Sequence, residues 1–282
     1  MEGVLKGIKV IDFGNATVGP YATTLLAYLG ADVIKVEPLA GEMIRFNSGG
    51  NPNDGSTFGR NMIANSNTKR FIALNLKDNR DRKIALDLVE KADIIEENFR
   101  SAEVMERLGL GYDVVSKINP RLIFLSASAY GNKGPWKGMG STDGYARAAS
   151  GSTSISGKAD GKGEMLRGIA NVDFTAAHTN ASAILLALYA REKTGRGQRI
   201  NTSQWQSAIV VQTTRVAEYF ATGKQPDRLA TARTNIVPDQ AFAARDGYIN
   251  VSVINDGLWP KFCRAIAREE LIEDSRFETN EL

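Results

Sequence analysis

The first half of the chain alternates short apolar runs with segments of helical periodicity. Runs with the length and composition of buried strands lie at residues 8–13, 32–37, 71–76, 94–99 and 122–127. Between them, residues 20–29 predict a helix with Pro20 in its first turn, and Asp78 can cap a second helix that runs to about Lys91. Strands that alternate with helices are typical of an α/β domain with a largely parallel sheet.

The pattern changes at Asp173, where a long helical segment begins. Small and apolar residues recur at helical spacing as far as Thr194, and glycines follow. A further helix is predicted over residues 203–221. Residues 242–251 predict a hairpin around Asp246-Gly247.

Residues 39–68 are rich in Gly, Asn and Ser and are predicted to form a long loop, a kind of segment that is often functional. The elements together predict a Rossmann-like large domain over residues 1–200. A smaller α+β domain is expected to start at residue 201 and to continue to residue 282.

The composition is that of an ordinary globular protein, with 282 residues, 43% of them hydrophobic, and a formal net charge of +3. This small excess does not require nucleic acid, but it suits a small polyanionic ligand. The chain has one cysteine, Cys263, and one histidine, His178, so we predict neither a disulfide framework nor a metal site. The most apolar stretch, residues 181–190, is too short to cross a membrane, and we expect a cytoplasmic protein.

A motif close to the dinucleotide fingerprint lies between the first predicted strand and helix. It runs from Gly14 to Gly19, and Glu37 ends the next strand. Ala16, however, stands where a glycine would let the backbone approach a pyrophosphate, and Pro20 removes an amide from the helix start. A dinucleotide-dependent enzyme is therefore kept only as an alternative from a different class.

Several segments, taken in order, resemble the family III coenzyme A transferases. They are Leu5–Asp12, Gly19–Thr23, Leu29–Pro38, Asn67–Arg70, Glu97–Arg100, Met105–Tyr112, Asn119–Ile123, Thr194–Gln198 and Asp274–Phe277. The resemblance spans nearly the whole chain. It implies an interlocked homodimer, or a heteromer with a related subunit. It also implies transfer of coenzyme A between an acyl-CoA and a free carboxylic acid, with coenzyme A as substrate and no prosthetic group.

The resemblance implies that Asp173 is the nucleophile, in the sequence Val172-Asp173-Phe174. Its attack on an acyl-CoA gives an acyl–aspartyl anhydride and then an aspartyl-CoA thioester. We expect the helix N-terminus to keep this carboxylate ionised. Backbone amides near Thr17 and Val18 are candidates for stabilising the oxyanion. The plainer interpretation is that Asp173 only caps the helix.

The resemblance also implies a set of residues that contact coenzyme A. They are Ala16, Val18, Asn98, Phe99, Arg107, Leu108 and Tyr130. From residue chemistry alone, Lys69, Arg70, Arg100 and Arg107 could bind its phosphates, although each basic residue by itself is more often a solvated surface charge. Thr17 stands where the formyl-CoA branch has a glutamine, so we do not assign that branch's reaction.

Two further alternatives stay open. Related acyl-CoA racemases pair the aspartate with a histidine, and Thr142 occupies that position here, which favours a transferase because threonine is no general base near neutral pH. The chain ends at Leu282, where family members continue, and residues 229–240 hold no glycine-rich loop. A non-catalytic partner subunit of a heteromeric transferase is therefore the second alternative.

Overall fold

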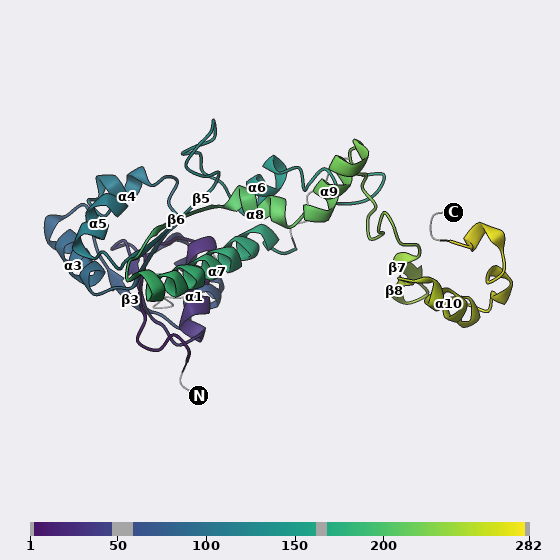
Figure 1. Ribbon diagram of the computed structural model, residues 1–282, viewed down its shortest axis with the longest axis horizontal. Coiled ribbons are helices and arrows are strands. Elements are labelled where there is room, and N and C mark those ends of the chain that lie inside the picture. Colours follow the sequence, from purple (N-terminus) through teal and green to yellow (C-terminus); the bar gives the residue numbers. More distant parts are fainter. Residues whose placement is uncertain (1–2, 47–58, 162–167, 280–282) are drawn as a thin grey trace. The chain divides into compact units, whose positions relative to one another are not determined.

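The computed structural model describes residues 3–46, 59–161 and 168–279. The chain divides into two compact units, residues 1–152 with 167–217, and residues 153–166 with 218–282 (Figure 1). The domain bounds predicted from the sequence, 1–200 and 201–282, remain a prediction.

The first unit contains a six-stranded parallel sheet of order β3-β2-β1-β4-β5-β6. Its strands are β1 (Lys9–Asp12), β2 (Asp32–Glu37), β3 (Arg70–Ala73), β4 (Ile94–Glu97), β5 (Ile123–Ser128) and β6 (Arg199–Ser203). The predicted α/β class is confirmed, and five of the strands were predicted. The strand order reverses between β1 and β4, and ligands of open α/β sheets bind at the carboxyl edge beside such a switch point.

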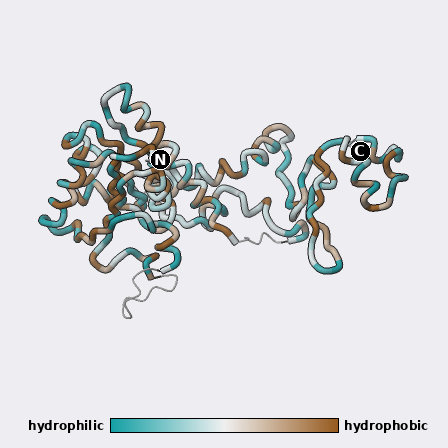
Figure 2. Tube along the Cα trace, turned by 90° about the horizontal axis from the view of Figure 1, so that it is seen from below, coloured by the Kyte–Doolittle hydropathy of each residue, from teal (hydrophilic) through white to brown (hydrophobic). Residues whose placement is uncertain are grey.

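Helices cover both faces of this sheet (Figure 1). On one face, α1 (Val18–Tyr28) and α7 (Asn171–Thr194) pack against Val10 of β1. On the other, α3 (Asn79–Glu90), α4 (Glu103–Arg107) and α5 (Tyr112–Ile118) pack against Ile11 of the same strand. Neighbouring residues of a strand point to opposite faces, so the continuous apolar runs supply two cores. Hydrophobic segments run through the interior of this unit, and hydrophilic ones lie at its periphery (Figure 2).

The predicted long loop at residues 39–68 is wrong in part, because it contains two helical elements. They are the 3-10 helix η1 (Met43–Arg45) and the helix α2 (Arg60–Ser66), while residues 47–58 lie outside the described residues. The polar sequence of α2 has no clear apolar periodicity. Contacts with other elements stabilise α2 instead, since Met62 is buried and Thr24 Oγ1 donates to the carbonyl oxygen of Asn65 at 2.6 Å.

The predicted helix over residues 203–221 is two helices, α8 (Gln204–Val210) and α9 (Thr213–Thr222). Gln212, between them, is buried, and its amide donates to the carbonyl oxygens of Ser150 at 2.9 Å and Ala208 at 3.0 Å. This contact draws the end of α8 towards α6 (Asp143–Ala149). Such a distant partner cannot be read from helical periodicity.

The second unit contains the predicted hairpin, with β7 (Asp239–Ala244) antiparallel to β8 (Gly247–Ser252). It continues through η2 (Asp256–Leu258), α10 (Trp259–Ala265), η3 (Glu269–Leu271) and η4 (Ser275–Phe277). Within the described part of the chain, no helix has both the length and the apolar character that a membrane span requires.

Candidate active site

Asp173 lies in the first turn of α7. Gly195, the residue after the helix, adopts the left-handed conformation with φ 70°. Asn180, further along this helix, accepts a hydrogen bond from Thr202 Oγ1 at 2.7 Å. Its amide donates to the carbonyl oxygen of Val18 at 3.5 Å. These contacts hold α7 between the end of β6 and the start of α1.

Asp143, the first residue of α6, accepts hydrogen bonds from the free amides at the start of α7. Its Oδ2 accepts hydrogen bonds from the N–H of Val172 at 2.9 Å and of Asp173 at 3.3 Å. A carboxylate is favoured at a helix N-terminus, so this contact stabilises α7. The predicted cause of ionisation is therefore wrong, because these amides bind the carboxylate of Asp143 and not that of Asp173.

The environment of Asp173 raises the pKa of its carboxyl group to about 6. Burial is the main cause and the nearby Asp143 carboxylate the second, while a hydrogen bond from Gln204 acts in the opposite direction. At pH 7 roughly nine tenths of such a group is still ionised. A carboxylate of raised pKa is also a stronger base and nucleophile than an ordinary one.

Gln204 contacts Asp173 directly and was not predicted from the sequence. It is the first residue of α8 and is buried, and its Nε2 donates to Oδ1 of Asp173. Oδ2 of Asp173 accepts no hydrogen bond from any described residue, and no described cation pairs with this carboxylate. The nucleophile candidate thus has a neutral donor on one oxygen and a second oxygen left for chemistry.

The loop after β1 is fixed by residues from two other elements. The N–H of Asn15 donates to Oδ1 of Asn98 at 2.7 Å, and Nδ2 of Asn98 donates back to the carbonyl oxygen of Asn15 at 2.8 Å. Ala16 adopts a positive φ of 58°, and its N–H donates to the carboxylate of Glu42. Asn98 follows β4, so these bonds join the two loops at the switch point of the sheet.

A pocket of about 420 Å³ opens at the same carboxyl edge. Two predicted residues line it, Phe99 and Leu108, together with Asn15. The rest of the lining was not predicted and comprises Phe13, Val36, Glu37, Pro38, Leu39, Leu74, Asn75, Leu76 and Lys77. Most of these residues end or follow β2 and β3. They could have been predicted, because ligands of open α/β sheets bind at the carboxyl ends of the strands. The largely apolar walls suit a flat aromatic group.

The model of the family described as CoA-transferase family III matches residues 5–282. The chain belongs to CoA-transferase family III. It is 35% identical to an acyl-CoA transferase of Fusarium pseudograminearum, over 100% of this chain and 62% of that protein. It is 35% identical to acetyl-CoA:oxalate CoA-transferase of Acetobacter aceti, over 99% of this chain and 71% of that protein.

A solved structure of a CAIB/BAIF family protein from Brucella suis has the same fold, with a TM-score of 0.87 and 31% identity. The match covers 99% of this chain and 74% of that one. The chain therefore spans about two thirds of the length of the curated family III relatives it matches, between 62% and 71%.

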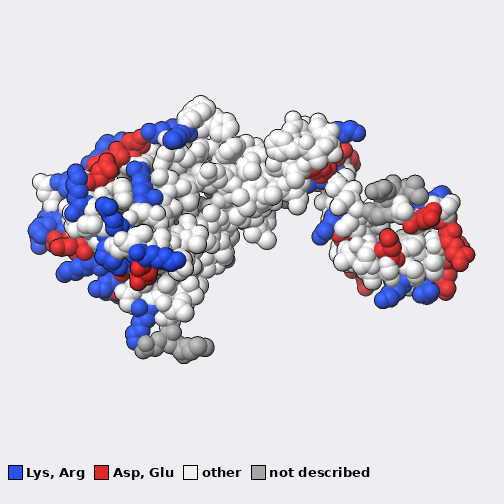
Figure 3. Space-filling view, in the orientation of Figure 1, with Lys and Arg blue, Asp and Glu red and all other residues white. Residues whose placement is uncertain are grey.

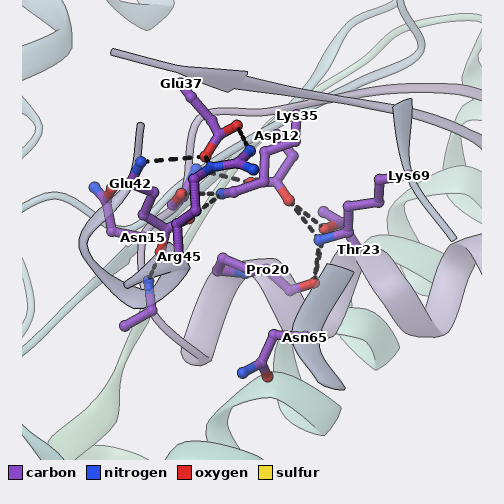
Figure 4. A network of polar contacts seen from close by, with 12 residues as sticks. Asp12, Asn15, Pro20, Thr23, Lys35, Glu37, Glu42, Arg45, Asn65 and Lys69 are labelled. Carbon is purple, nitrogen blue, oxygen red and sulfur yellow. Dashed lines mark hydrogen bonds and ion pairs between the residues drawn. The ribbon is translucent and has the colours of Figure 1, made fainter. Parts of the chain in front are cut away.

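Two of the basic residues predicted to bind phosphates lie elsewhere in this family III fold. Lys69 is buried, and its ammonium contacts Oδ2 of Asp12 at 2.7 Å and the carbonyl oxygen of Pro20 (Figure 4). Arg70 pairs with Asp32, the first residue of β2, at 2.6 Å. Lys69 is thus held inside the protein, and Arg70 is directed towards the amino ends of the strands, away from the pocket.

The other predicted contacts lie around the carboxyl edge of the sheet. Arg107 is exposed at the end of α4, next to Leu108 in the pocket wall, and Arg100 is exposed after β4. The ring of Tyr130 contacts that of Trp136 at 5.2 Å between centroids. Val18 is the first residue of α1 and Thr17 precedes it, and no hydrogen bond between described residues joins either to Asp173.

The strand order is that of a dinucleotide-binding domain, but the loop at Ala16 differs in chemistry. Its amide, which would face a pyrophosphate there, already binds the carboxylate of Glu42. That carboxylate is in turn paired with Lys35 at 2.8 Å (Figure 4). A protein anion therefore fills this position, which argues against the dinucleotide alternative. Among the residues that the structure describes, His, Cys, Asp and Glu form no metal-binding group.

Proposed function

We propose that this chain transfers coenzyme A between an acyl-CoA and a free carboxylic acid, with Asp173 as the nucleophile. The observation that carries the proposal is the state of the Asp173 carboxylate. It is partly buried, its pKa is raised to about 6, and among the described residues it contacts a neutral amide and no cation. A carboxylate that only capped its helix would bind the helix amides, and Asp143 does so here.

The proposed reaction begins with attack of Asp173 on the acyl-CoA carbonyl, which gives an acyl–aspartyl anhydride and the CoA thiolate. The thiolate attacks the aspartyl carbonyl and releases the first acid. A second acid then reverses these steps through its own anhydride and leaves as its CoA thioester. Each intermediate stays activated, which is why a carboxylate suits this exchange.

The pocket at the carboxyl edge is the proposed site for the nucleotide part of coenzyme A. Phe99 and Leu108 give it apolar walls for the adenine. Lys77 lines the pocket and the exposed Arg107 adjoins Leu108, so these two cations are the candidates for the phosphates. Asn98 holds the adjoining loop at Asn15. In this proposal Asn98 shapes the site, and Lys69 and Arg70 take no part in binding.

The racemase alternative has less support, and the reason is the residue before Asp143, which is Thr142. Thr142 precedes α6, so the residue that would be histidine in a racemase lies next to the carboxylate that contacts the start of α7. A threonine there supplies no proton acceptor near neutral pH. His178 is exposed on α7, where its Nδ1 lies 2.7 Å from the carbonyl oxygen of Phe174.

The test is to incubate the protein with acetyl-CoA or succinyl-CoA and a panel of free acids that includes oxalate. New acyl-CoA, measured by mass spectrometry and lost in Asp173→Asn, would support the transferase. Deuterium uptake from heavy water at the α-carbon of a branched acyl-CoA, without any new acyl-CoA, would support the racemase. An assembly whose activity survives Asp173→Ala would make this chain a non-catalytic partner subunit.

We also propose a protein partner, either a second copy or a related subunit. Charged side chains gather over α3, α4 and α5 and are sparse over α6 and α8 (Figure 3). Large apolar side chains are exposed on these and on the adjoining α7, among them Tyr145 at 65%, Val210 at 59% and Leu186 at 68%. Such a surface is typical of a protein interface. Light scattering during gel filtration should give the mass of a dimer if the partner is a second copy. A monomer would contradict the homodimer and leave only the related subunit.

A further inference from the structure

The fold holds Gln204 against one oxygen of Asp173. The Ser203 hydroxyl accepts the N–H of Gln206 at 3.2 Å and so caps α8, and the N–H of Trp205 donates to the carbonyl oxygen of Ala129 at 3.0 Å. Both bonds fix the backbone around Gln204 at the carboxyl ends of β5 and β6. Because an ionised carboxylate only accepts hydrogen bonds, the amide must present its NH₂ group to Oδ1 of Asp173.

The proposed reaction places negative charge on an oxygen of Asp173 itself. When the CoA thiolate attacks the anhydride, a bond forms between sulfur and Cγ, and the carbonyl electron pair moves onto the oxygen that is not bridging. Collapse restores the carbonyl, breaks the bond from Cγ to the bridging oxygen and releases the acid. In the return direction the acid's carboxylate oxygen bonds to Cγ, the same oxygen takes the charge, and the thiolate leaves.

We propose that Gln204 is a catalytic residue that stabilises this charge on Oδ1 of Asp173, which makes Oδ2 the attacking and bridging oxygen. This inference rests on the proposed function. Preorganised donors aimed at a developing oxyanion are among the largest contributions to catalysis. A neutral amide suits both stages, because it does not neutralise the nucleophile as a cation would, and its hydrogen bond strengthens as the charge grows. The amides near Thr17 and Val18 then remain candidates for the other oxyanion, on the acyl carbonyl.

The experiment compares two glutamines of the same helix. Gln204→Met keeps the length of the buried side chain but removes the donor, and Gln206→Met makes the same change at an exposed position. With succinyl-CoA or acetyl-CoA and no acceptor acid, rapid quenching and peptide mass spectrometry give the rate at which the Asp173–CoA thioester forms. We expect Gln204→Met to slow this step by about 10²-fold or more, with Gln206→Met unchanged.

Binding of free coenzyme A, measured by calorimetry, should be the same in both variants and the wild type, which separates a catalytic loss from a loss of structure. Thioester formation in Gln204→Met at the wild-type rate would overturn the inference. Absence of any adduct in the wild type would instead contradict the proposed function.

A measurement on the wild type covers the case in which Gln204→Met does not fold. With isotope-labelled aspartate, the infrared carbonyl band of the trapped thioester should lie at lower frequency than that of a free thioester, because the donor polarises the carbonyl. An unshifted band would contradict the role of Gln204.

Discussion

Two aspartates of the first unit, Asp12 and Asp173, lie in opposite kinds of surroundings. Asp12 is fully buried, and Lys69 and Lys35 lie 2.7 Å and 3.7 Å from its two oxygens. Burial alone would raise the pKa of Asp12, but these lysines outweigh it and hold that pKa well below its ordinary value. Asp173 has a carboxylate and an amide as neighbours, and its pKa is raised.

The difference separates a carboxylate that stabilises the fold from one that is available to react. The charge of Asp12 is neutralised by cations within a network that also holds the carbonyl oxygens of Gly14 and Pro20 (Figure 4). Asp173 pairs with no cation among the described residues, and its raised pKa fits the nucleophile proposed above. Strongly perturbed groups of the second kind are candidates for function.

The largest expected effect is loss of activity in Asp173→Asn. An amide cannot form the anhydride, so CoA transfer should fall by about 10³-fold or more. The assay is turnover of the best acyl-CoA and acid pair from the panel, with Asp12→Asn as the matched change at the structural aspartate. Equal losses of turnover per folded molecule in the two variants would remove the distinction between them.

The stabilities of the same two variants should change in opposite directions. Asp12→Asn leaves two buried lysines without their carboxylate and should destabilise the protein by about 3 to 5 kcal/mol at pH 7. The raised pKa of Asp173 means that the wild type loses stability as pH rises from about 4 to about 6. Asp173→Asn should therefore be more stable than the wild type at pH 8, with the difference vanishing near pH 4, in denaturant unfolding experiments.

The pH dependence of turnover should follow the carboxyl group of Asp173. Because the ionised form attacks, kcat/KM should fall as pH drops below about 6. Asp143→Asn keeps a side-chain oxygen that can cap α7 but removes the charge that raises the pKa, so its profile should move to lower pH. A profile unmoved by Asp143→Asn would show that another group controls the rate.

The smallest expected effect is on the KM for acyl-CoA, and it should differ between Arg107 and Arg70. Arg107→Ala should raise the KM for acyl-CoA severalfold, because an exposed phosphate contact contributes only about 1 kcal/mol. Arg70→Ala should leave the KM unchanged, because this side chain pairs with Asp32. Steady-state kinetics checks both, and an equal rise in both variants would contradict the placement of the nucleotide at the pocket.

Prediction from sequence succeeded where local signals decide the structure. Apolar runs found the strands from β1 to β5, and Asp78 caps α3 as expected, accepting the N–H of Arg80 at 2.8 Å. β6 was missed because Arg199–Ser203 is an edge strand with mostly polar residues. Lys69 was assigned to phosphate because its partner, Asp12, is distant in sequence and close only in the fold.

The same limit applies to the site. Asp173 could be found from its family resemblance and its place at a helix start, but Asp143 and Gln204 could not. Their roles depend on α6, α7 and α8 meeting at one point, which no spacing in the sequence reveals. The pocket residues after β2 and β3 were open to prediction, since all carboxyl ends of a parallel sheet share one edge.

The most direct test of the account is to identify the residue that becomes acylated or linked to coenzyme A. The protein is incubated with acyl-CoA, treated with hydroxylamine and digested, and its peptides are weighed by mass spectrometry. The account predicts a hydroxamate on Asp173, formed in the wild type and absent from Asp173→Asn. Turnover that proceeds with Asp173 unmodified, or with the hydroxamate on another carboxylate, would contradict it.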